Sequence, residues 1–433
     1  MRSAFSSRPP TATAGPCRQF LLATLVNAIL FTVASLAPSA RAQNEATSPS
    51  SSSPQSGLPS LRLVRTLSAP NEISTLGMPQ SGNSNMTISP DGERLAAYVH
   101  FGVGIILWSP DGKYVKEIHR HSNFGLGAGI LAFVSGHSQL VTSPAAETNS
   151  QEDRDKADHA AFSVLDADTG KVVRSIEGPN SAQGAPENSA YELAVSPDQR
   201  LVAVVYGRRD PLIGIYGTSD WHLVTAIRPL SNTQVDPRAL TFSTDGRILA
   251  VARGRKGAVQ FYNVGTWDVS RTLEAFSDKS PAVDPLLAGI AFSPDGAMVA
   301  IASFDGGLWR LDSNGKPTGS WFGVLKQEFP VDPLRVFGAR TGDHVASLGS
   351  FPGVKIGHAI SWSPAGNYLA FLDGLGDIRL WDPSQPGLAI SAASMGLNSS
   401  TLAFTPDGSL LMADDHNGIK VFEVIPQTSE KLR

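Results

Sequence analysis

Short apolar runs recur along most of this chain, and polar clusters rich in Ser, Pro, Asp and Gly separate them. One stretch shows the arrangement clearly, with the runs "LTF" (240–242), "ILAVAR" (248–253), "AVQFYN" (258–263) and "DVSRTL" (268–273) joined by polar segments. Short runs rich in β-branched and aromatic residues, bounded by turn residues, are typical of β strands. The stretch therefore predicts a unit of four strands.

A turn phrase follows the first run of most such units. It reads Ser-Pro-Asp-Gly at 293–296, and variants of it begin at Ser89, Ser196, Ser243, Ser363 and Thr405. Pro fixes φ at its own position, Asp hydrogen-bonds to nearby backbone, and Gly accepts a positive φ, so this order favours a β turn. We interpret the phrase as the reversal between the first and second strands of a unit, without a chemical role.

The units recur along the chain, and their first runs start at Met86, Leu131, Leu193, Leu240, Ile290, Ile360 and Leu402. The starts are roughly 40 to 70 residues apart, and repeats of four short strands at about 40–50 residues indicate the blades of a β-propeller. We therefore predict an all-β fold, a seven-bladed propeller of four-stranded antiparallel blades. An eighth blade is the alternative if the segment 304–333 contains a degenerate repeat.

The last unit lacks a fourth strand, because the run 419–424 is followed only by the polar tail 425–433. A run of the missing type, "LRLVRTL" (61–67), precedes the first unit instead. Pairing of this run with the last unit completes the blade and removes an exposed sheet edge. We expect the propeller to span 60–424 and to be closed by its N-terminal strand.

The N-terminal segment has the features of an export signal. Arginines precede the apolar run 20–37, and the small-x-small sequence Ala40-Arg41-Ala42 follows it. We expect residues 1–42 to be a signal peptide that directs the protein to the periplasm or the extracellular space. Retention as a single-span anchor is the alternative, and only then is membrane contact expected. The Ser- and Pro-rich segment 43–59 is expected to be a disordered linker.

The strand and turn phrases resemble the WD-repeat (tryptophan–aspartate) β-propeller family across 60–424. The family's dipeptide at the end of the third strand is intact at Trp381-Asp382, its opening Gly-His at Gly357-His358, and its structural Asp at Asp305. Most of the family's hydrogen-bond network is thus absent, so core packing must replace it. The sixth unit also resembles the repeat of the periplasmic Tol-system propeller. Both resemblances imply a rigid platform that binds other proteins.

Composition excludes several kinds of chemistry. The formal net charge is −4 and no Lys/Arg run is present, so nucleic acid is not an expected partner. Cys17 is the only cysteine and precedes the apolar run, so the mature chain has no thiol. We find no catalytic, cofactor-binding or metal-binding motif and predict a non-catalytic protein without a cofactor. The alternative is a propeller enzyme or small-ligand binder in which Asp305, Asp373 and Asp414 line the central channel and bind a cation.

The links between second and third strands open on one face of a propeller, and here their charges differ between blades. The basic set is Arg208, Arg209, Arg253, Arg255 and Lys256; the acidic set is Asp305, Asp373, Asp377, Asp414 and Asp415; the long link 304–333 adds Trp309, Trp321 and Phe322. Complementary charge orients partners, and aromatic residues anchor interfaces. We expect this face of a monomeric propeller to bind another protein or macromolecule.

Overall fold

The structure, a computed structural model of the chain, describes residues 58–67, 86–99, 104–109, 111–119, 130–135, 138–144, 152, 160–178, 190–206, 211–229, 239–253, 257–276, 283–310, 333–349, 359–373, 376–385, 389–395, 401–415 and 418–426. The chain divides into two units, Met1–Pro54 and Gln55–Arg433, and all described residues belong to the second. The expected signal peptide and nearly all of the expected linker therefore lie outside the described residues.

The described strands form seven sheets of four strands, here called blades 1 to 7. Blade 1 contains β2 (Met86–Ile88), β3 (Leu95–Val99), β4 (Gly104–Trp108) and β5 (Tyr114–His119). Blade 2 contains β6 (Leu131–Val134), β7 (Gln139–Thr142), β8 (Ala160–Asp166) and β9 (Val172–Glu177). Blade 3 contains β10 (Ala190–Val195), β11 (Leu201–Tyr206), β12 (Leu212–Gly217) and β13 (Leu223–Ile227). Blade 4 contains β14 (Ala239–Phe242), β15 (Ile248–Arg253), β16 (Ala258–Asn263) and β17 (Val269–Glu274).

The remaining blades follow the same order. Blade 5 contains β18 (Val283–Phe292), β19 (Met298–Arg310), β20 (Leu334–Gly338) and β21 (His344–Ser347). Blade 6 contains β22 (Ile360–Trp362), β23 (Leu369–Leu372), β24 (Asp377–Trp381) and β25 (Ala389–Ser394). Blade 7 contains β26 (Leu402–Phe404), β27 (Leu410–Asp415), β28 (Gly418–Ile425) and, as its outer strand, β1 (Ser60–Leu67).

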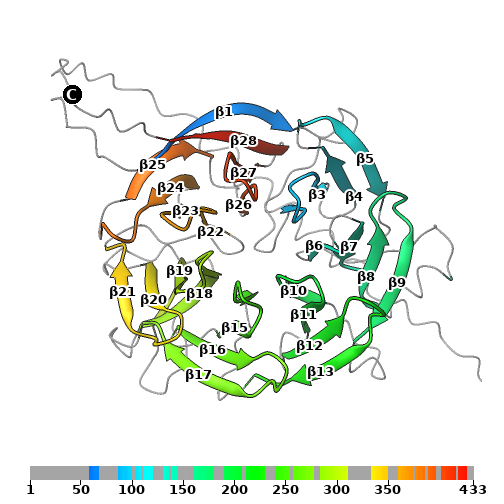
Figure 1. The fold of residues 1–433 in the computed structure, drawn as a ribbon, viewed down its shortest axis with the longest axis horizontal. Coiled ribbons are helices and arrows are strands. Elements are labelled where there is room, and N and C mark those ends of the chain that lie inside the picture. Colours follow the sequence, from blue (N-terminus) through cyan, green and yellow to red (C-terminus); the bar gives the residue numbers. More distant parts are fainter. Residues whose placement is uncertain are drawn as a thin grey trace, which may run out of the picture. The chain divides into compact units, whose positions relative to one another are not determined.

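The seven blades stand in a ring, and within each blade the four antiparallel strands lie in order from the centre to the rim (Figure 1). The predicted all-β, seven-bladed propeller is therefore confirmed. The predicted runs 248–253 and 258–263 coincide with β15 and β16. The sequence pattern does not predict β25, the fourth strand of blade 6.

Every blade buries both of its faces, and β11 shows how the sequence achieves this. Val202 and Val204 pack in a cluster with blade 2, whereas Ala203 and Val205 pack in a cluster with blade 4. All four side chains are completely buried. Successive side chains of a strand point to opposite faces, so a strand covered on both faces needs apolar residues at every position. The unbroken run "LVAVVY" is the result.

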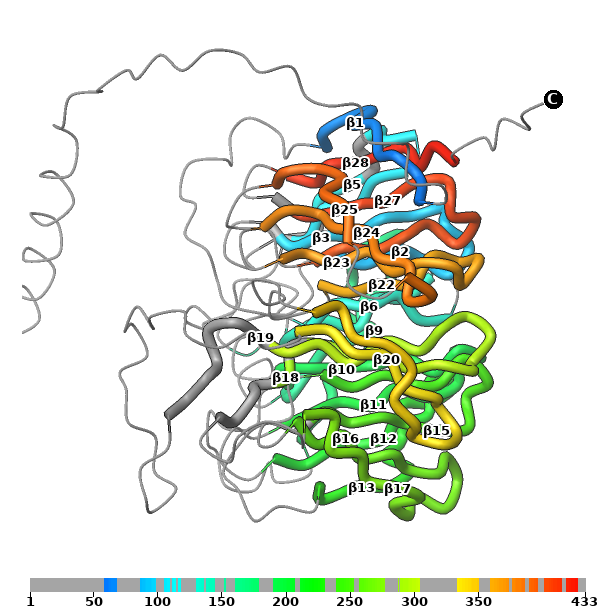
Figure 2. Tube along the Cα trace, turned by 90° about the vertical axis from the view of Figure 1, so that its left-hand side faces the viewer, coloured from blue at the N-terminus to red at the C-terminus, as the bar shows by residue number. Residues whose placement is uncertain are grey.

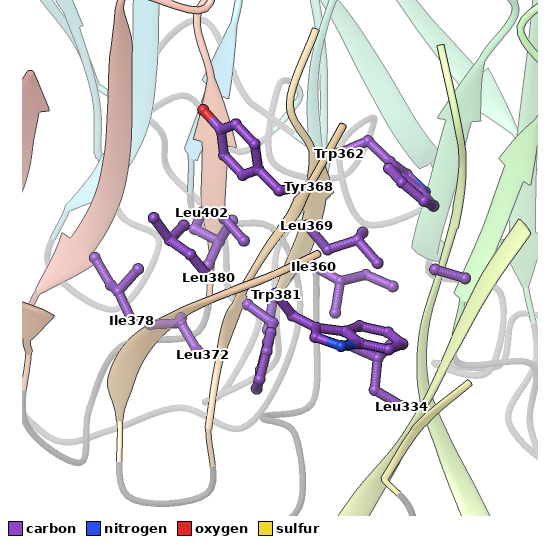
Figure 3. Packing of buried hydrophobic residues seen from close by; sticks show 14 of the residues in the cluster. Leu334, Ile360, Trp362, Tyr368, Leu369, Leu372, Ile378, Leu380, Trp381 and Leu402 are labelled. Atoms are coloured by element: carbon purple, nitrogen blue, oxygen red, sulfur yellow. The ribbon is translucent and has the colours of Figure 1, made fainter. Parts of the chain in front are cut away.

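The core is a circle of side-chain clusters that lie between blades rather than within one blade. Six clusters together join every pair of neighbouring blades. The largest spans blades 5, 6 and 7, to which Leu334, Trp381 and Leu402 belong respectively (Figure 3). Burial of one such large side chain contributes about 1.5–3 kcal/mol. Each blade therefore depends on its two neighbours for most of its stability.

The N-terminal strand closes the ring as predicted. β1 pairs antiparallel with β28, from Ser60 opposite Ile425 to Leu67 opposite Ile419, and the two strands lie side by side in both views (Figures 1 and 2). Leu67 is buried in a cluster that contains residues of blade 1 and blade 7. β1 thus completes blade 7 and contributes to its junction with blade 1.

The rim of the ring carries a repeated irregularity. In every blade the pairing of the third and fourth strands contains a register shift. In all seven blades this shift leaves one residue of the fourth strand without an opposite residue in the ladder, namely Val64, Val115, Val173, Val224, Ser270, Val345 or Ala392. Bulges twist an edge strand and interrupt its regular pairing. The bulges therefore protect the outer strands from edge-to-edge association.

The repeated phrase forms the predicted β turn. In blade 5 the Ser293 hydroxyl donates to Asp295 Oδ1 at 2.5 Å, and equivalent Ser–Asp or Thr–Asp bonds of 2.5–2.6 Å recur in four other blades. In blade 6, where Ala365 replaces the aspartate, the Ser363 hydroxyl donates to Asn367 Oδ1 at 2.8 Å. The turn is thus stabilised by its own side chains even where the sequence departs from the phrase.

The turns of neighbouring blades also touch one another. A Cβ placed on Gly408 lies 3.4 Å from Pro364 Cδ of the preceding blade, and one placed on Gly92 lies 3.1 Å from Pro406 Cδ across the closure between blades 7 and 1. Glycine and the flat proline ring therefore allow close packing around one face of the ring. The phrase serves packing between blades as well as chain reversal.

Blade 3 departs from this pattern at Gln199, which has a φ of 62° where the other turns have glycine. A left-handed conformation costs a non-glycine residue about 1 kcal/mol, and Gln199 Oε1 is buried without a hydrogen-bond partner among the described residues. Gln199→Gly is expected to raise the free energy of unfolding in urea by about 1 kcal/mol. The matched change Gly246→Gln in blade 4 is expected to lower it by a similar amount. A Gln199→Gly variant no more stable than the natural sequence contradicts this explanation.

The turn carboxylates make stability depend on pH. Hydrogen bonds from Ser or Thr hydroxyls lower the pKa values of Asp198, Asp245, Asp295 and Asp407 in the folded protein. Because the unfolded value is about 3.9, the ionised forms stabilise the fold above about pH 4, and this contribution is lost as the pH falls through the lower folded values. The melting temperature is expected to fall between about pH 5 and about pH 3. Changing all four residues to Asn, which keeps the acceptor oxygen, is expected to flatten that fall; an unchanged slope excludes this cause.

Candidate functional site

The antiparallel order of each blade places its connections on two opposite faces. The turns between first and second strands and between third and fourth strands form the turn face. The links between second and third strands lie on the other side, here called the link face. Most candidate residues belong to the link face, and six of them, Arg208, Arg209, Arg255, Lys256, Trp321 and Phe322, lie outside the described residues.

The structure places two other candidates at the ends of second strands. Arg253 is the last residue of β15 in blade 4, and Asp415 is the last residue of β27 in blade 7. Both strands end at the link face, because they run there from the turn face. Residues of opposite charge therefore stand at this face in blades 4 and 7.

Asp373, at the end of the second strand of blade 6, is completely buried and paired within the protein. Its Oδ2 accepts a hydrogen bond from Arg379 Nε at 2.8 Å, and its Oδ1 accepts one from the backbone N–H of Asp377 at 2.9 Å. Arg379 also donates from Nη2 to Asp377 Oδ2 at 3.3 Å. The negative charge of Asp373 is therefore neutralised internally, next to a link of the link face.

Asp414 of blade 7 has an equally structural role. It is 7% exposed, and its Oδ1 accepts the backbone N–H of Thr401 at 2.6 Å. The backbone N–H of Asp414 donates in turn to Thr401 O at 3.1 Å, which ties β27 to the start of β26. Both carboxylates are thus buried and hold local structure together. The acidic part of the link face is weaker than the sequence indicated.

Blade 5 also differs from the expectation, because part of the segment read as a loop is a strand. β19 continues to Arg310 and pairs with β18 as far as Val283, whereas β20 pairs with β19 only up to Ala302. Asp305 and Trp309 therefore belong to a two-stranded extension of the blade rather than to a loop. The prediction of a link over 304–333 is wrong for residues 304–310.

The sequence misled here for a local reason. Asp305 is followed by two glycines, an order that is typical of turns. In the structure a register shift in the β18–β19 ladder falls at this point, between the pairs Leu286–Phe304 and Asp284–Trp309. The turn-like residues are thus accommodated as an irregularity within a longer strand.

A set of basic residues, not among the predicted site residues, joins one blade to the next. Lys116 Nζ donates to Asp168 O of blade 2 at 2.7 Å, and Arg271 Nη2 donates to Ala339 O of blade 5 at 2.8 Å. Arg65 of β1 donates in the same way to a backbone carbonyl of blade 1. These residues hold the same place in the aligned fourth strands "RLVRTL", "KYVKEI" and "DVSRTL". A recurring cation in otherwise variable strands was the signal available in the sequence.

Metal ligands, membrane-spanning helices and similarity to known proteins also bear on the kind of site. Within the described ranges, no group of three or more His, Cys, Asp or Glu side chains could hold a metal ion. In that same part of the chain, no helix has the length and apolar character needed to span a membrane. No family model matches the chain. No curated protein matches it either.

Arg379 is expected to be essential for the stability of blade 6. Arg379→Met leaves the buried Asp373 carboxylate without its cation, and loss of one partner of a buried pair costs about 3–5 kcal/mol. The free energy of unfolding, measured in urea, is expected to fall by roughly this amount, reduced to about 3 kcal/mol because Arg379 keeps partial solvent contact. The double variant Arg379→Met/Asp373→Asn is expected to be more stable than the single variant. A single variant that unfolds like the natural protein contradicts the structural role of the pair.

Proposed function

We propose that this protein is an exported, non-catalytic β-propeller scaffold that binds another protein through its link face. The observation that supports the proposal is that the two faces differ in the length of their connections. On the turn face, the chain reverses in short turns closed by internal hydrogen bonds. On the link face, it leaves blade 2 at Thr142 and re-enters at Ala160, and leaves blade 5 at Arg310 and re-enters at Leu334. Binding residues concentrate on long connections that a rigid scaffold positions.

The scaffold supplies the rigidity that such a role needs. Because both faces of each blade are buried against neighbours, the bases of the links are fixed by the core. A preorganised surface loses less conformational freedom on binding. The aromatic residues Trp309, Trp321 and Phe322 in the blade 5 segment are the anchors we propose, since buried aromatic side chains dominate binding energies at interfaces. No bond is made or broken in this mechanism.

The charges of the link face favour a partner with an acidic surface. Arg208 and Arg209 of blade 3 and Arg253, Arg255 and Lys256 of blade 4 form the basic part of this face. Asp305 and Asp415 remain as acidic candidates, whereas Asp373 and Asp414 are engaged internally. The basic part therefore produces the stronger electrostatic field. This field attracts acidic partners and orients them as they approach.

The resemblance to WD-repeat propellers supports the binding role. In blade 6 the dipeptide Trp381-Asp382 ends the third strand, and the Trp381 side chain is completely buried in the cluster that joins blades 5 to 7. We propose that this is a degenerate WD-repeat propeller in which packing between blades replaces the family's hydrogen-bond network. Export to the periplasm or beyond, with cleavage after Ala42, completes the proposal.

Charge neutralisation tests the binding face. A chain beginning at Gln43, with Arg208, Arg209, Arg253 and Arg255 changed to Ser, is expected to capture its acidic partner at least tenfold more weakly than the unchanged chain in a pull-down at low salt. The control changes four basic residues of the turn face to Ser, namely Lys113, Lys171, Arg200 and Arg247. Equal capture by the link-face variant and the unchanged chain, or equal losses in both variants, overturns the proposed face.

A further inference from the structure

The closing strand β1 is attached differently from the other outer strands. In blade 3, for example, the outer strand β13 follows β12 after a short turn in which the Trp221 N–H donates to Gly217 O at 2.8 Å. β1 has no such covalent neighbour in its sheet, because its pairing partner β28 is the last strand in the sequence. On its other side the chain continues from Leu67 and enters blade 1 only at Met86. β1 is thus held in blade 7 by non-covalent contacts alone.

Those contacts bury little of the strand. The backbone ladder runs along the whole of β1, but among its side chains only Leu67 is buried, and Leu61 packs partly against the neighbouring cluster. Leu63 is 51% exposed and Val64 is 40% exposed. Apolar burial contributes free energy in proportion to the area removed from water. The strand therefore depends mainly on its backbone hydrogen bonds and on its two ends.

Two arginines add contacts that cross to other strands. Arg62 Nε donates to Glu423 Oε2 of β28 at 2.8 Å, and this pair is largely exposed. Arg65 donates to the carbonyl of Asp111 in blade 1. Exposed ion pairs contribute only about 0–1 kcal/mol each. A local opening can therefore break all of these contacts while the remaining blades stay folded.

We infer that β1 is an exchangeable strand: it leaves the edge of β28 without unfolding the other blades, and this edge then accepts residues 60–67 of a second copy of the chain. An open edge of β28 presents unpaired backbone groups, which pair readily with an incoming strand. The segment from a second copy offers every contact of the resident strand, including Leu61, Leu67 and both arginines. This inference is independent of the proposed binding role of the link face.

At ordinary protein concentrations, the chain's own β1 binds the edge of β28 in preference to β1 of a second copy. Its connection to Met86 keeps it near the edge of β28 at an effective concentration of the order of millimolar. Exchange between copies is therefore expected only at high protein concentration, or in variants in which the contacts of β1 are weakened. The product is a pair of closed rings that have traded identical strands.

Hydrogen exchange of the unmodified mature chain gives the first test. The backbone amides of β1, and those of β28 that face β1, are expected to exchange at least tenfold faster than the corresponding amides of β13 and β12 in blade 3. Such a difference shows an opening confined to the closing strand. Equal protection in the two blades overturns the inference, because β1 then leaves only when the whole protein unfolds.

A disulfide across the closing pair provides a switch for the second test. Arg62 and Glu423 are cross-strand partners, and Cys17 of the signal segment is the only natural cysteine, so Arg62→Cys/Glu423→Cys creates one defined bridge in the mature chain. Oxidation is expected to bring the protection of β28 to the level of β12, and reduction is expected to reverse this. The matched variant Arg62→Ser/Glu423→Ser is expected to be insensitive to oxidant. An oxidised bridge that leaves the protection of β28 unchanged counts against the inference.

Strand capture gives the third test. In the full mature chain, Arg62→Glu places like charges opposite each other and Leu67→Ala removes the buried end of β1, so the resident strand is weakened. A fluorescent peptide with the natural sequence 58–67 is expected to bind this variant saturably and not to bind the oxidised disulfide variant. Concentrated unmodified protein is expected to form a dimer by light scattering, which the disulfide suppresses.

Several outcomes overturn the proposal. They are absence of peptide binding by a folded variant, equal binding of a scrambled peptide, and a dimer that forms despite the disulfide. The last result identifies another contact between copies. If the weakened variant does not fold, the hydrogen-exchange comparison on the unmodified chain still decides whether β1 opens separately from the other blades.

Discussion

The burial of both faces of every blade is the constraint on which the rest of this structure depends. A sheet that is apolar on both sides cannot stand at the end of a row, because one face would meet water. Val202 and Ala203 of β11, neighbours in sequence, are each completely buried against a different blade. A closed circle is the arrangement that leaves no uncovered blade. The packing of blade 7 against blade 1 closes this circle, and the pairing of β1 with β28 adds the outer strand of the last blade.

Local signals made most of the fold predictable. The turn phrase marks the reversal between the first two strands in six of the seven blades. The missing fourth run after 419–424, together with its counterpart at 61–67, predicted the closure. Contacts between residues that belong to different units left weaker signals. Arg271, for example, donates to carbonyl groups of blade 5 that lie far from it in sequence. Asp373 and Asp414 were read as surface charge for the same reason, since exposure is decided by packing that a run of letters does not specify. The extension of β19 was hidden by turn-like residues.

The two faces of the ring differ in how their connections are built. The turn face is self-contained: hydroxyl, carboxylate and backbone groups satisfy one another within each turn, and Gly–Pro contacts link successive turns. The link face receives the long connections and the basic residues of blades 3 and 4. In the proposed binding role, stability and recognition would rest on separate residues, so changes in the links would leave the core intact.

The register of the closing pair has a consequence for the order of the chain. Ser60 lies directly opposite Ile425, so the first and last residues of the propeller are cross-strand neighbours. A short peptide that joins them leaves every sheet unaltered, and fresh termini can then be opened in any other turn of the circle. The ring has no intrinsic first blade, and the point at which the natural polypeptide starts is one choice among seven equivalent architectures.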